Sequence, residues 1–449
     1  MYYFLLAFVL LSPLPFGANR PWAWSLCSML FALCGLVFFI QVLLNKRTIV
    51  LNNKAIWVSA LLWCIPIIWI FIQTSTFVPD SWVHPFWKLA AEQLKTSITP
   101  IISVNAEASY TALMRLMSYA LVFFLSFQLN RNSDKAALTF NALAYIGFAY
   151  ALYGLIVYLG NFKTILWFDK WTYIDNVTST FVNRNTYGTY AGLSLLAIGP
   201  LLFNTFDSSL KYGLSSHFGR EFFYEQVLIK GWFPLLMAFT VISALLMSQS
   251  RGGCLSTLFA VICLVIVLLA SHKINKKSGL FALVLMVTLI VWLVFSKSFD
   301  VLISRLDRLD IESVGRANVY TMIAKVATEP DFLGLGYGTF ENSFRLYRDE
   351  TIDGFYDKAH NTYLENIFEL GWIPAMALFL SMLWLALLCL RGVWVRRRNW
   401  FYPALGFAAS VLVGTHAFAD FSLQIPAVAY TYALMLGVGV SQASSTRTK

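Results

Sequence analysis

Arginine residues beside long apolar segments are the first candidates for chemistry in this sequence. Arg251 lies in Ser248-Gln-Ser-Arg251-Gly-Gly253, a short turn between two apolar segments, and its two glycines let the backbone approach a bound molecule closely. A guanidinium group presents a planar pair of donors to phosphate and stays protonated at every relevant pH. We therefore expect Arg251 to bind an anion. The alternative is an arginine in a tight turn whose side chain extends toward the membrane surface.

Three further arginines stand at positions where an anion could bind. Arg115 lies inside an apolar segment that holds no acidic partner, so its counter-charge is either on another span or on an anionic ligand. Arg184 stands at the expected start of a helix, where backbone N–H groups and the helix dipole favour an anion. The alternative at that position is that Asn183 or Asn185 only caps the helix. Arg316 opens an expected amphipathic helix, where a solvated surface arginine is the usual explanation.

His360 is the residue that could move a proton. Asn361, Glu365 and Glu369 follow it at a spacing that puts them on one helix face, with His360 at the edge of that face. An imidazole titrates near neutral pH and could take a proton from a hydroxyl group. The alternative is a structural histidine in a loop. A second pair at helical spacing, His416 and Asp420, could be a buried hydrogen-bonded pair.

The composition assigns these residues to a membrane protein. Of 449 residues, 58% are hydrophobic and 12% are charged, against roughly 25% charged residues in soluble domains. This excludes a soluble enzyme, a disordered scaffold and a disulfide-stapled secreted module. The formal charge of +10 is typical of Lys and Arg in cytoplasmic connections, so we expect no nucleic-acid partner. The six cysteines have no paired spacing, so neither disulfides nor a zinc site are expected.

Windows of about 20 apolar residues predict about twelve transmembrane helices. The expected spans cover residues 2–17, 21–43, 55–73, 109–129, 137–160, 185–205, 232–250, 253–271, 279–296, 370–390, 400–419 and 426–441. Lys and Arg gather in alternate connections, which predicts that both termini are cytoplasmic. A connection over residues 74–108 is long enough to contribute an interfacial helix.

The connection over residues 297–369 differs from the others because it is long, densely charged and net acidic. Helix signals cover Arg316 to Thr328 and Phe340 to Arg348, and a third helix is expected from near Asp357 into the next span. The predicted fold is therefore an all-α polytopic membrane protein in three parts. Residues 1–296 form spans one to nine, residues 297–369 form a helical lobe on the outer face, and residues 370–449 form the last three spans and the C-terminus.

Several motifs, in their order along the chain, resemble the bacterial O-antigen ligase and O-antigen polymerase superfamily. They are Pro15-Phe-Gly-Ala-Asn-Arg20-Pro-Trp-Ala-Trp24, Asn183-Arg-Asn185, Ser250-Arg251-Gly-Gly253, Gly315-Arg316, Gly334-Leu-Gly336-Tyr-Gly338-Thr-Phe340, His360-Asn361 and Asp420-Phe-Ser-Leu-Gln-Ile-Pro426. The resemblance runs along the whole chain in topology and is most specific over residues 248–371.

The resemblance implies a C-type glycosyltransferase fold that acts at the periplasmic face of the bacterial inner (cytoplasmic) membrane. Members transfer a glycan from undecaprenyl diphosphate to a sugar hydroxyl, of lipid A core for the ligases or of a growing glycan for the polymerases. They use no nucleotide sugar and, for the ligases, no required metal; no cofactor is implied. By position, Arg251 and Arg316 would hold the donor diphosphate and His360 would activate the acceptor hydroxyl.

Arg184 and Arg115 are further diphosphate candidates, because each stands where an anion could bind. The two activities share these motifs, so ligase and polymerase both stay open at this point. Two hypotheses of other classes also remain: a transporter of a small anion such as bicarbonate, and a non-catalytic partner in an envelope assembly complex.

Overall fold

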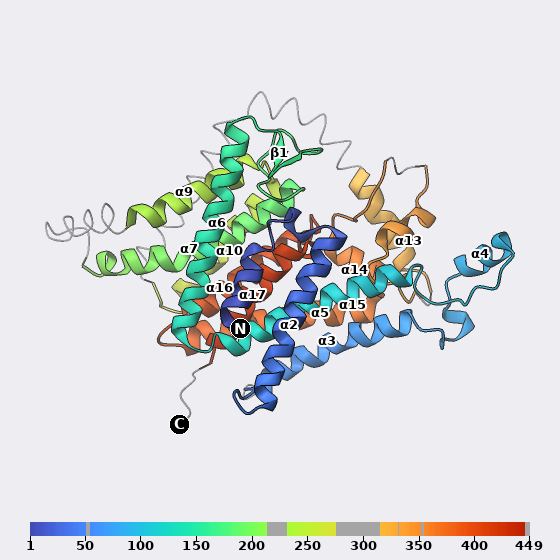
Figure 1. Ribbon diagram of the computed structural model, residues 1–449, viewed down its shortest axis with the longest axis horizontal. Coiled ribbons are helices and arrows are strands. Elements are labelled where there is room, and N and C mark those ends of the chain that lie inside the picture. Colours follow the sequence, from blue (N-terminus) through green and yellow to red (C-terminus); the bar gives the residue numbers. More distant parts are fainter. Residues whose placement is uncertain are drawn as a thin grey trace.

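The computed structural model shows a protein built almost entirely from helices (Figure 1). It describes residues 1–50, 54–212, 231–274, 315–330, 332–350, 352 and 354–444. The α-helices are α1 (Tyr2–Leu11), α2 (Pro21–Leu43), α3 (Lys54–Gln73), α4 (Phe86–Leu94), α5 (Ala106–Leu129), α6 (Ser133–Leu159), α7 (Arg184–Tyr212), α9 (Trp232–Met247), α10 (Arg251–Ala270), α13 (Phe340–Tyr347), α14 (Thr362–Leu370), α15 (Trp372–Val395), α16 (Phe401–His416) and α17 (Pro426–Gln442). A further helix covers residues 315–327.

Short elements complete the described chain. Three 3-10 turns, η1 (Phe16–Ala18), η2 (Asp80–Trp82) and η4 (Ser422–Gln424), lie between helices. Two strands of two residues each, β1 (Thr164–Ile165) and β2 (Phe168–Asp169), pair antiparallel in the connection between α6 and α7. Helix α4 occupies the connection where an interfacial helix is expected.

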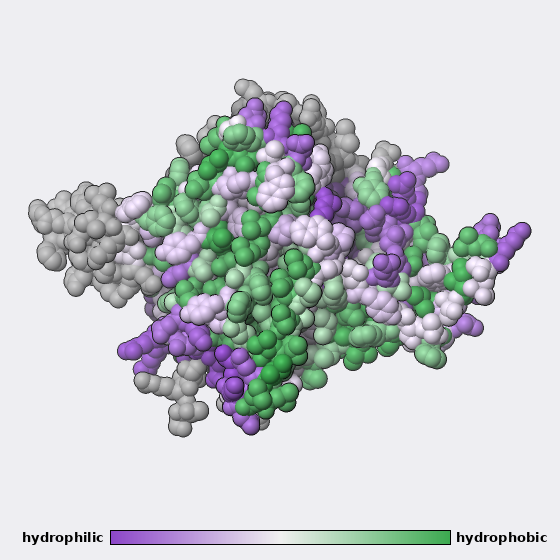
Figure 2. Space-filling view, viewed as in Figure 1, coloured by the Kyte–Doolittle hydropathy of each residue, from purple (hydrophilic) through white to green (hydrophobic). Residues whose placement is uncertain are grey.

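Seven of the described helices are long and apolar enough to cross a membrane: α2, α3, α5, α6, α7, α10 and α15. The protein is therefore a polytopic, all-helical membrane protein. Apolar surface covers the middle of the molecule, and polar surface gathers near the C-terminus at one end and near α13 and β1 at the other (Figure 2). The count of twelve spans stays a prediction, and the expected span at 279–296 lies outside the described residues.

The first expected span, residues 2–17, differs in the structure. Helix α1 ends at Leu11 after ten residues, about 15 Å of helix against a hydrocarbon core of about 30 Å. Pro13 and Pro15 follow it and cannot continue an α-helix, because proline lacks the backbone donor.

Helix α17 forms the centre of the bundle. Each of its residues from Pro426 to Gln442 is buried, and it packs mainly against α5 and α16. Small residues allow this close packing: a Cβ atom on Gly437 would lie 2.6 Å from the Ser126 side chain, and one on Gly439 would lie 3.0 Å from the Gly406 Cα atom. Without a hydrophobic driving force in lipid, such close backbone approach is what stabilises helix contacts.

The helix over 315–327, α13 and α14 form a helical lobe, a name we keep for these three elements. Its core is a group of aromatic rings, in which Phe340 and Phe344 stack at 4.9 Å and Phe368 meets Phe340 edge-on at 5.7 Å. The first two helices lie where the sequence predicts them.

The third helix of the lobe was predicted wrongly at both ends. Helix α14 begins at Thr362 and not near Asp357, because the Asn361 side chain caps it by accepting from the Tyr363 and Leu364 amides. It also does not run into the next span, because Gly371 at φ 79° separates α14 from α15.

Candidate functional site

His360 lies where the helical lobe meets the end of α16. Its backbone is left-handed (φ 53°), which is strained for a residue with a Cβ atom. Contacts on both sides hold this conformation: Tyr320 donates from its hydroxyl to the His360 carbonyl at 2.9 Å, and the Thr362 amide donates to the Ala417 carbonyl at 2.8 Å. The ring packs edge-on against Phe421 at 4.9 Å and keeps 19% of its side chain exposed. The imidazole is therefore both oriented and accessible.

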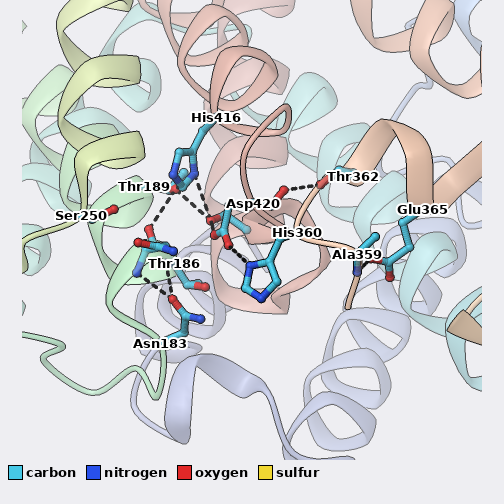
Figure 3. A network of polar contacts seen from close by, with 12 residues as sticks. Asn183, Thr186, Thr189, Ser250, Ala359, His360, Thr362, Glu365, His416 and Asp420 are labelled. Atoms are coloured by element: carbon cyan, nitrogen blue, oxygen red, sulfur yellow. Dashed lines mark hydrogen bonds and ion pairs between the residues drawn. The ribbon is translucent and has the colours of Figure 1, made fainter. Parts of the chain in front are cut away.

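Asp420 is the partner of His360. Asp420 Oδ1 lies 3.4 Å from His360 Nδ1, and the other ring nitrogen points away from the carboxylate (Figure 3). Asp420 is fully buried, and burial opposes its ionisation. The contacts with His360, His416 and Ser422 outweigh that effect and hold the pKa of Asp420 below its ordinary value. The carboxylate is thus charged at neutral pH and faces an imidazole.

The sequence pairing of His416 with Asp420 along one helix does not hold. Helix α16 ends at His416, so Asp420 lies in the turn beyond it and its carboxylate meets a histidine sixty positions earlier in the chain. The Asp420 backbone carbonyl accepts from the Thr362 hydroxyl at 2.8 Å, which fixes the turn to the start of α14.

Arg184 and Arg251 are the first residues of two neighbouring helices, α7 and α10. Asn183 caps α7 by accepting from the Asn185 amide at 2.7 Å, and Ser250 caps α10 by accepting from the Gly253 amide at 3.1 Å. The two helix starts touch, because a Cβ atom on Gly253 would lie 3.0 Å from the Gly188 Cα atom. The backbone positions of both arginines therefore lie at one edge of the bundle, where helix dipoles favour negative charge.

The two guanidinium groups differ in their surroundings. Arg184 lies 5.4 Å from the Tyr173 ring, and its buried Nε atom has no hydrogen-bond partner among the described residues. Arg251 is exposed. Asn183 does cap its helix, as one interpretation of that motif expects, and the binding of an anion by Arg184 stays a prediction.

Arg316 lies in the first turn of the helix over 315–327 and is half-buried. Tyr320, one turn later on the same helix, is the residue that bonds the His360 carbonyl. Residues four apart share a helix face. The fold therefore brings Arg316 to the side of the helical lobe that contacts His360.

Arg115 lines a large cavity of about 680 Å³ in the bundle. Helices α3, α5, α15, α16 and α17 form mostly apolar walls, and Lys358, Thr362, Asn366 and Glu369 line it where the helical lobe meets the bundle. The Arg115 guanidinium lies 4.8 Å from the Trp24 ring, and its buried Nε atom has no hydrogen-bond partner in the described part of the chain. An amphiphile with an anionic head and a long apolar chain suits this arrangement.

The two acidic residues that follow His360 at helical spacing both accept hydrogen bonds from backbone amides. Glu365 accepts from the Ala359 amide at 2.8 Å and pairs with Lys358 at 3.3 Å, so it holds the segment that carries the histidine. Glu369 accepts from the Phe340 amide at 2.9 Å. Burial and the neighbouring Glu365 raise the pKa of Glu369 to about 7.

Sequence reasoning missed the contact of Asp420 with His360 and the position of Lys358 on the cavity. The signal for Asp420 was its motif Asp420-Phe-Ser-Leu-Gln-Ile-Pro426, but no pattern within one sequence reveals a contact across sixty residues. Within the described ranges, no group of three or more His, Cys, Asp or Glu side chains is placed to hold a metal ion.

Residues 236–380 match the family model Wzy_C, described as O-antigen ligase. A search of curated proteins finds no match. The matched segment holds Arg251, Arg316 and His360, while Arg115, Arg184 and Asp420 lie outside it. Over residues 236–380 the chain therefore matches the O-antigen ligase family, which confirms its resemblance to the O-antigen ligase and polymerase superfamily.

Proposed function

We propose that the protein transfers a glycan from undecaprenyl diphosphate to an acceptor sugar hydroxyl, as an O-antigen ligase or as a repeat-unit polymerase. The family match supports a glycosyltransferase-like enzyme of surface polysaccharide biosynthesis in the broad sense. The observation that carries the finer proposal is the pair of His360 and Asp420, an accessible imidazole 3.4 Å from a buried, ionised carboxylate.

In this proposal His360 is the general base. With its Nδ1 proton directed at Asp420, the other ring nitrogen takes the proton of the acceptor hydroxyl. The acceptor oxygen attacks the anomeric carbon, and the bond from that carbon to the diphosphate oxygen breaks. Undecaprenyl diphosphate leaves with the electron pair, and the anomeric configuration inverts because there is a single displacement.

Arginines take the charge that develops on the leaving diphosphate. Arg251 and Arg316 are assigned this role by the resemblance, and Arg184 begins the helix beside Arg251. Fixed guanidinium groups need no reorganisation when charge appears, so they stabilise the transition state more than the bound substrate. Metal ions are not needed for that role in this proposal.

The apolar cavity supplies the place for the prenyl chain of the donor. Its walls come from membrane helices, so a lipid can enter it sideways from the bilayer. Arg115 and Lys358 would face the head of that lipid, and Lys358 stands two residues before His360 in the chain. In this proposal the reacting bond then lies near the imidazole.

The proposed location is the bacterial inner membrane, with both termini in the cytoplasm and the helical lobe in the periplasm. The distribution of Lys and Arg supports this orientation. The proposed partners are the undecaprenyl-diphosphate-linked donor, lipid A core or a growing glycan as acceptor, and membrane lipids.

The test uses the purified full-length protein in nanodiscs with an undecaprenyl-diphosphate oligosaccharide, with and without lipid A core, in the presence of EDTA. Product that requires core indicates a ligase, and a ladder without core indicates a polymerase. His360→Ala should abolish either product, whereas His272→Ala, at the other end of α10, should keep it. An active His360→Ala variant would refute the mechanism.

Absence of transfer by the intact wild type under all these conditions would refute the proposed function. The next assay would then be bicarbonate uptake into proteoliposomes, which tests the transporter hypothesis directly. A product that retains the configuration of the donor would refute the single displacement while leaving the enzyme class in place.

A further inference from the structure

Behind Asp420 lies a chain of buried polar side chains that the proposed mechanism does not use. Ser422 donates from its hydroxyl to Asp420 Oδ2 at 2.6 Å. Thr189 Oγ1 lies 3.0 Å from Ser422 Oγ and 2.6 Å from His416 Nδ1 (Figure 3). The chain therefore runs from His416 through Thr189 and Ser422 to the carboxylate that faces His360.

Proton counting fixes the direction of the hydrogen bond between Ser422 and Asp420. A carboxylate only accepts, so the single hydroxyl proton of Ser422 goes to Asp420. The Thr189 proton then goes to Ser422, or to the Asn185 carbonyl at 3.3 Å. His416 Nδ1 lies 2.6 Å from Thr189 Oγ1 and 3.2 Å from Ser422 Oγ, and the tautomer of the ring decides whether this nitrogen donates or accepts. The Ser422 hydroxyl therefore points at the carboxylate, and Thr189 and His416 both lie against Ser422 from behind.

The chain of hydrogen-bonded side chains is closed to solvent and joins segments that are far apart in the sequence. Thr189, Ser422, His416 and Asp420 have exposed fractions of 0%, 3%, 1% and 0%. Thr189 belongs to α7 and His416 to α16. On the α10 side the space is filled, because a Cβ atom on Gly252 would lie 2.7 Å from His416 Nε2. Buried hydrogen bonds of this kind fix a side chain firmly, since water cannot replace a lost partner.

We propose that His416, Thr189 and Ser422 are positioning residues that hold the Asp420 carboxylate toward His360. Ser422 occupies Oδ2, so Oδ1 stays available to the His360 ring. The imidazole is thereby kept with its other nitrogen toward the acceptor, and the imidazolium that forms during transfer meets a charged carboxylate. This inference rests on the proposed role of His360 as general base.

Other charged and titratable groups lie on the elements that carry or contact His360 and the hydrogen-bond chain. They are Arg184 on α7, Arg316 and Tyr320 on the helix over 315–327, Lys358 before the histidine, Glu365 on α14 and His416 on α16. None of them lies in the hydrogen-bond chain except His416. A change in the chain should therefore act through Asp420, while these groups stay in place.

The experiment measures kcat, KM and the pH–rate profile of Ser422→Ala and Thr189→Val, with Ser422→Thr as the conservative variant. Loss of the Ser422 hydroxyl leaves a buried carboxylate with one partner fewer, which favours its neutral form. The His360 imidazolium then loses its counter-charge. We expect kcat to fall about tenfold or more, KM to stay within about twofold, and the pH at which activity is lost on the acid side to move lower. In Ser422→Thr, kcat, KM and the pH of the acid-side loss should all return to their wild-type values.

A double-mutant cycle separates positioning from simple damage to the fold. Ser422→Ala should have no further effect on kcat in the Asp420→Asn background, because the serine acts only through that carboxylate. Ser194→Ala is the matched control, since Ser194 is also buried on α7 but donates to the Tyr190 carbonyl. We expect this variant to keep wild-type kcat and pH dependence.

A second measurement needs no turnover. Diethyl pyrocarbonate modifies neutral imidazole, so the pH dependence of His360 modification, read by mass spectrometry, should shift to lower pH in Ser422→Ala. A wild-type pH dependence in Ser422→Ala and Thr189→Val, or additive losses in the double mutant, would overturn the positioning role. If the wild type transfers no glycan, or His360→Ala remains active, the proposed function has failed instead.

Discussion

The ion pair of His360 and Asp420 predicts how activity depends on pH. Asp420→Asn removes the negative charge beside the imidazole, so the protonated form of His360 loses stabilisation. The pKa of Asp420 lies below its ordinary value, so the wild-type carboxylate stays charged over the pH range of the assay and does not itself cause the acid-side loss. In the variant, that loss should move to lower pH, and kcat should fall on the order of a hundredfold or more.

The pH–rate profile of Asp420→Asn is compared with that of Asp134→Asn. Asp134 is an acid in the first turn of α6, far along the chain from the site. We expect the Asp134 variant to follow the wild type. If Asp420→Asn loses activity on the acid side at the same pH as the wild type, whatever its kcat, the pair of His360 and Asp420 does not control proton transfer.

A substitution of Arg251 tests whether the charge or the planar geometry of the side chain matters for the reaction. Arg251→Lys keeps the positive charge and loses the planar pair of donors. If the guanidinium binds the diphosphate at two oxygens, kcat/KM should fall about tenfold or more. Arg391→Lys on α15 is the control for the same substitution. Equal kinetics in the Arg251 variant and the wild type would make Arg251 a residue of the turn only.

Single residues were predictable from sequence to different degrees. His360 and Arg251 stood out because their types and local motifs point to chemistry. Asp420 was noticed, but with His416 as its partner, since helical spacing is the only distance that a sequence displays. The actual partner, His360, depends on the packing of the helical lobe against the end of α16, and no local rule encodes that contact.

At the scale of the elements, the start of α10 depends on a close approach to α16. A Cβ atom on Gly252 would lie 2.7 Å from His416 Nε2 and 2.9 Å from Cδ2. Gly252→Ala must therefore displace the imidazole ring or the start of α10. We expect glycan transfer to fall at least several-fold, since Arg251 and the hydrogen-bond chain both move. The measurement is kcat together with the thermal midpoint.

Gly199→Ala on α7 is the matched control for that substitution. A Cβ atom at Gly199 meets only Leu405 Cδ2 at 3.7 Å, an ordinary contact. Alanine is a better helix former than glycine by about 1 kcal/mol, so this variant should be at least as stable as the wild type and fully active. If Gly252→Ala behaves in the same way, the ring of His416 is not held against α10.

Helix positions were predictable where periodicity or apolar length is strong, and helix ends were not. The long apolar helices lie in their expected segments, and the helix over 315–327 matches its signals. The ends of α14 were wrong because Asn361 caps the helix and Gly371 breaks it at a positive φ. Gly371 lies against the backbone of Leu333, where a Cβ atom would come within 3.1 Å, and the local sequence does not display such a tertiary contact.

At the scale of the whole molecule, Glu369 makes stability depend on pH. It is buried where the helical lobe meets the bundle, and burial together with Glu365 raises its pKa to about 7 from 4.5, against the opposing effect of Lys358. The unfolded chain therefore releases this proton at lower pH than the folded protein does. The contribution is fully present below about pH 4.5 and is lost as the pH rises through about 7, up to about 3 kcal/mol.

Glu369→Gln should remove this dependence while it keeps the acceptor for the Phe340 amide. The thermal midpoint of the wild type relative to the variant should fall as the pH rises from 5 to 8. Glu341 is in an exposed ion pair with Arg345. The thermal midpoint of Glu341→Gln should therefore change with pH in parallel with that of the wild type. A constant difference between wild type and Glu369→Gln over this range would show that Glu369 is already ionised in the fold.

The cavity in the bundle predicts that lipid access limits the reaction. Ala60 on α3 lines the cavity and is exposed, so Ala60→Phe adds a ring to the open space without displacing packed atoms. If the prenyl chain of the donor lies there, KM for the lipid-linked donor should rise about tenfold, while the thermal midpoint stays unchanged. Ala32→Phe, at an exposed position of α2 outside the cavity lining, should leave both quantities as in the wild type.

A donor with a short prenyl chain separates the two explanations for a loss of activity in Ala60→Phe. Blocked prenyl binding should spare the reaction of the short-chain donor, whereas damage to the catalytic groups should slow the reactions of both donors equally. Equal KM values in Ala60→Phe and the wild type would exclude the cavity as the donor site and leave the edge formed by Arg184 and Arg251 as the remaining route.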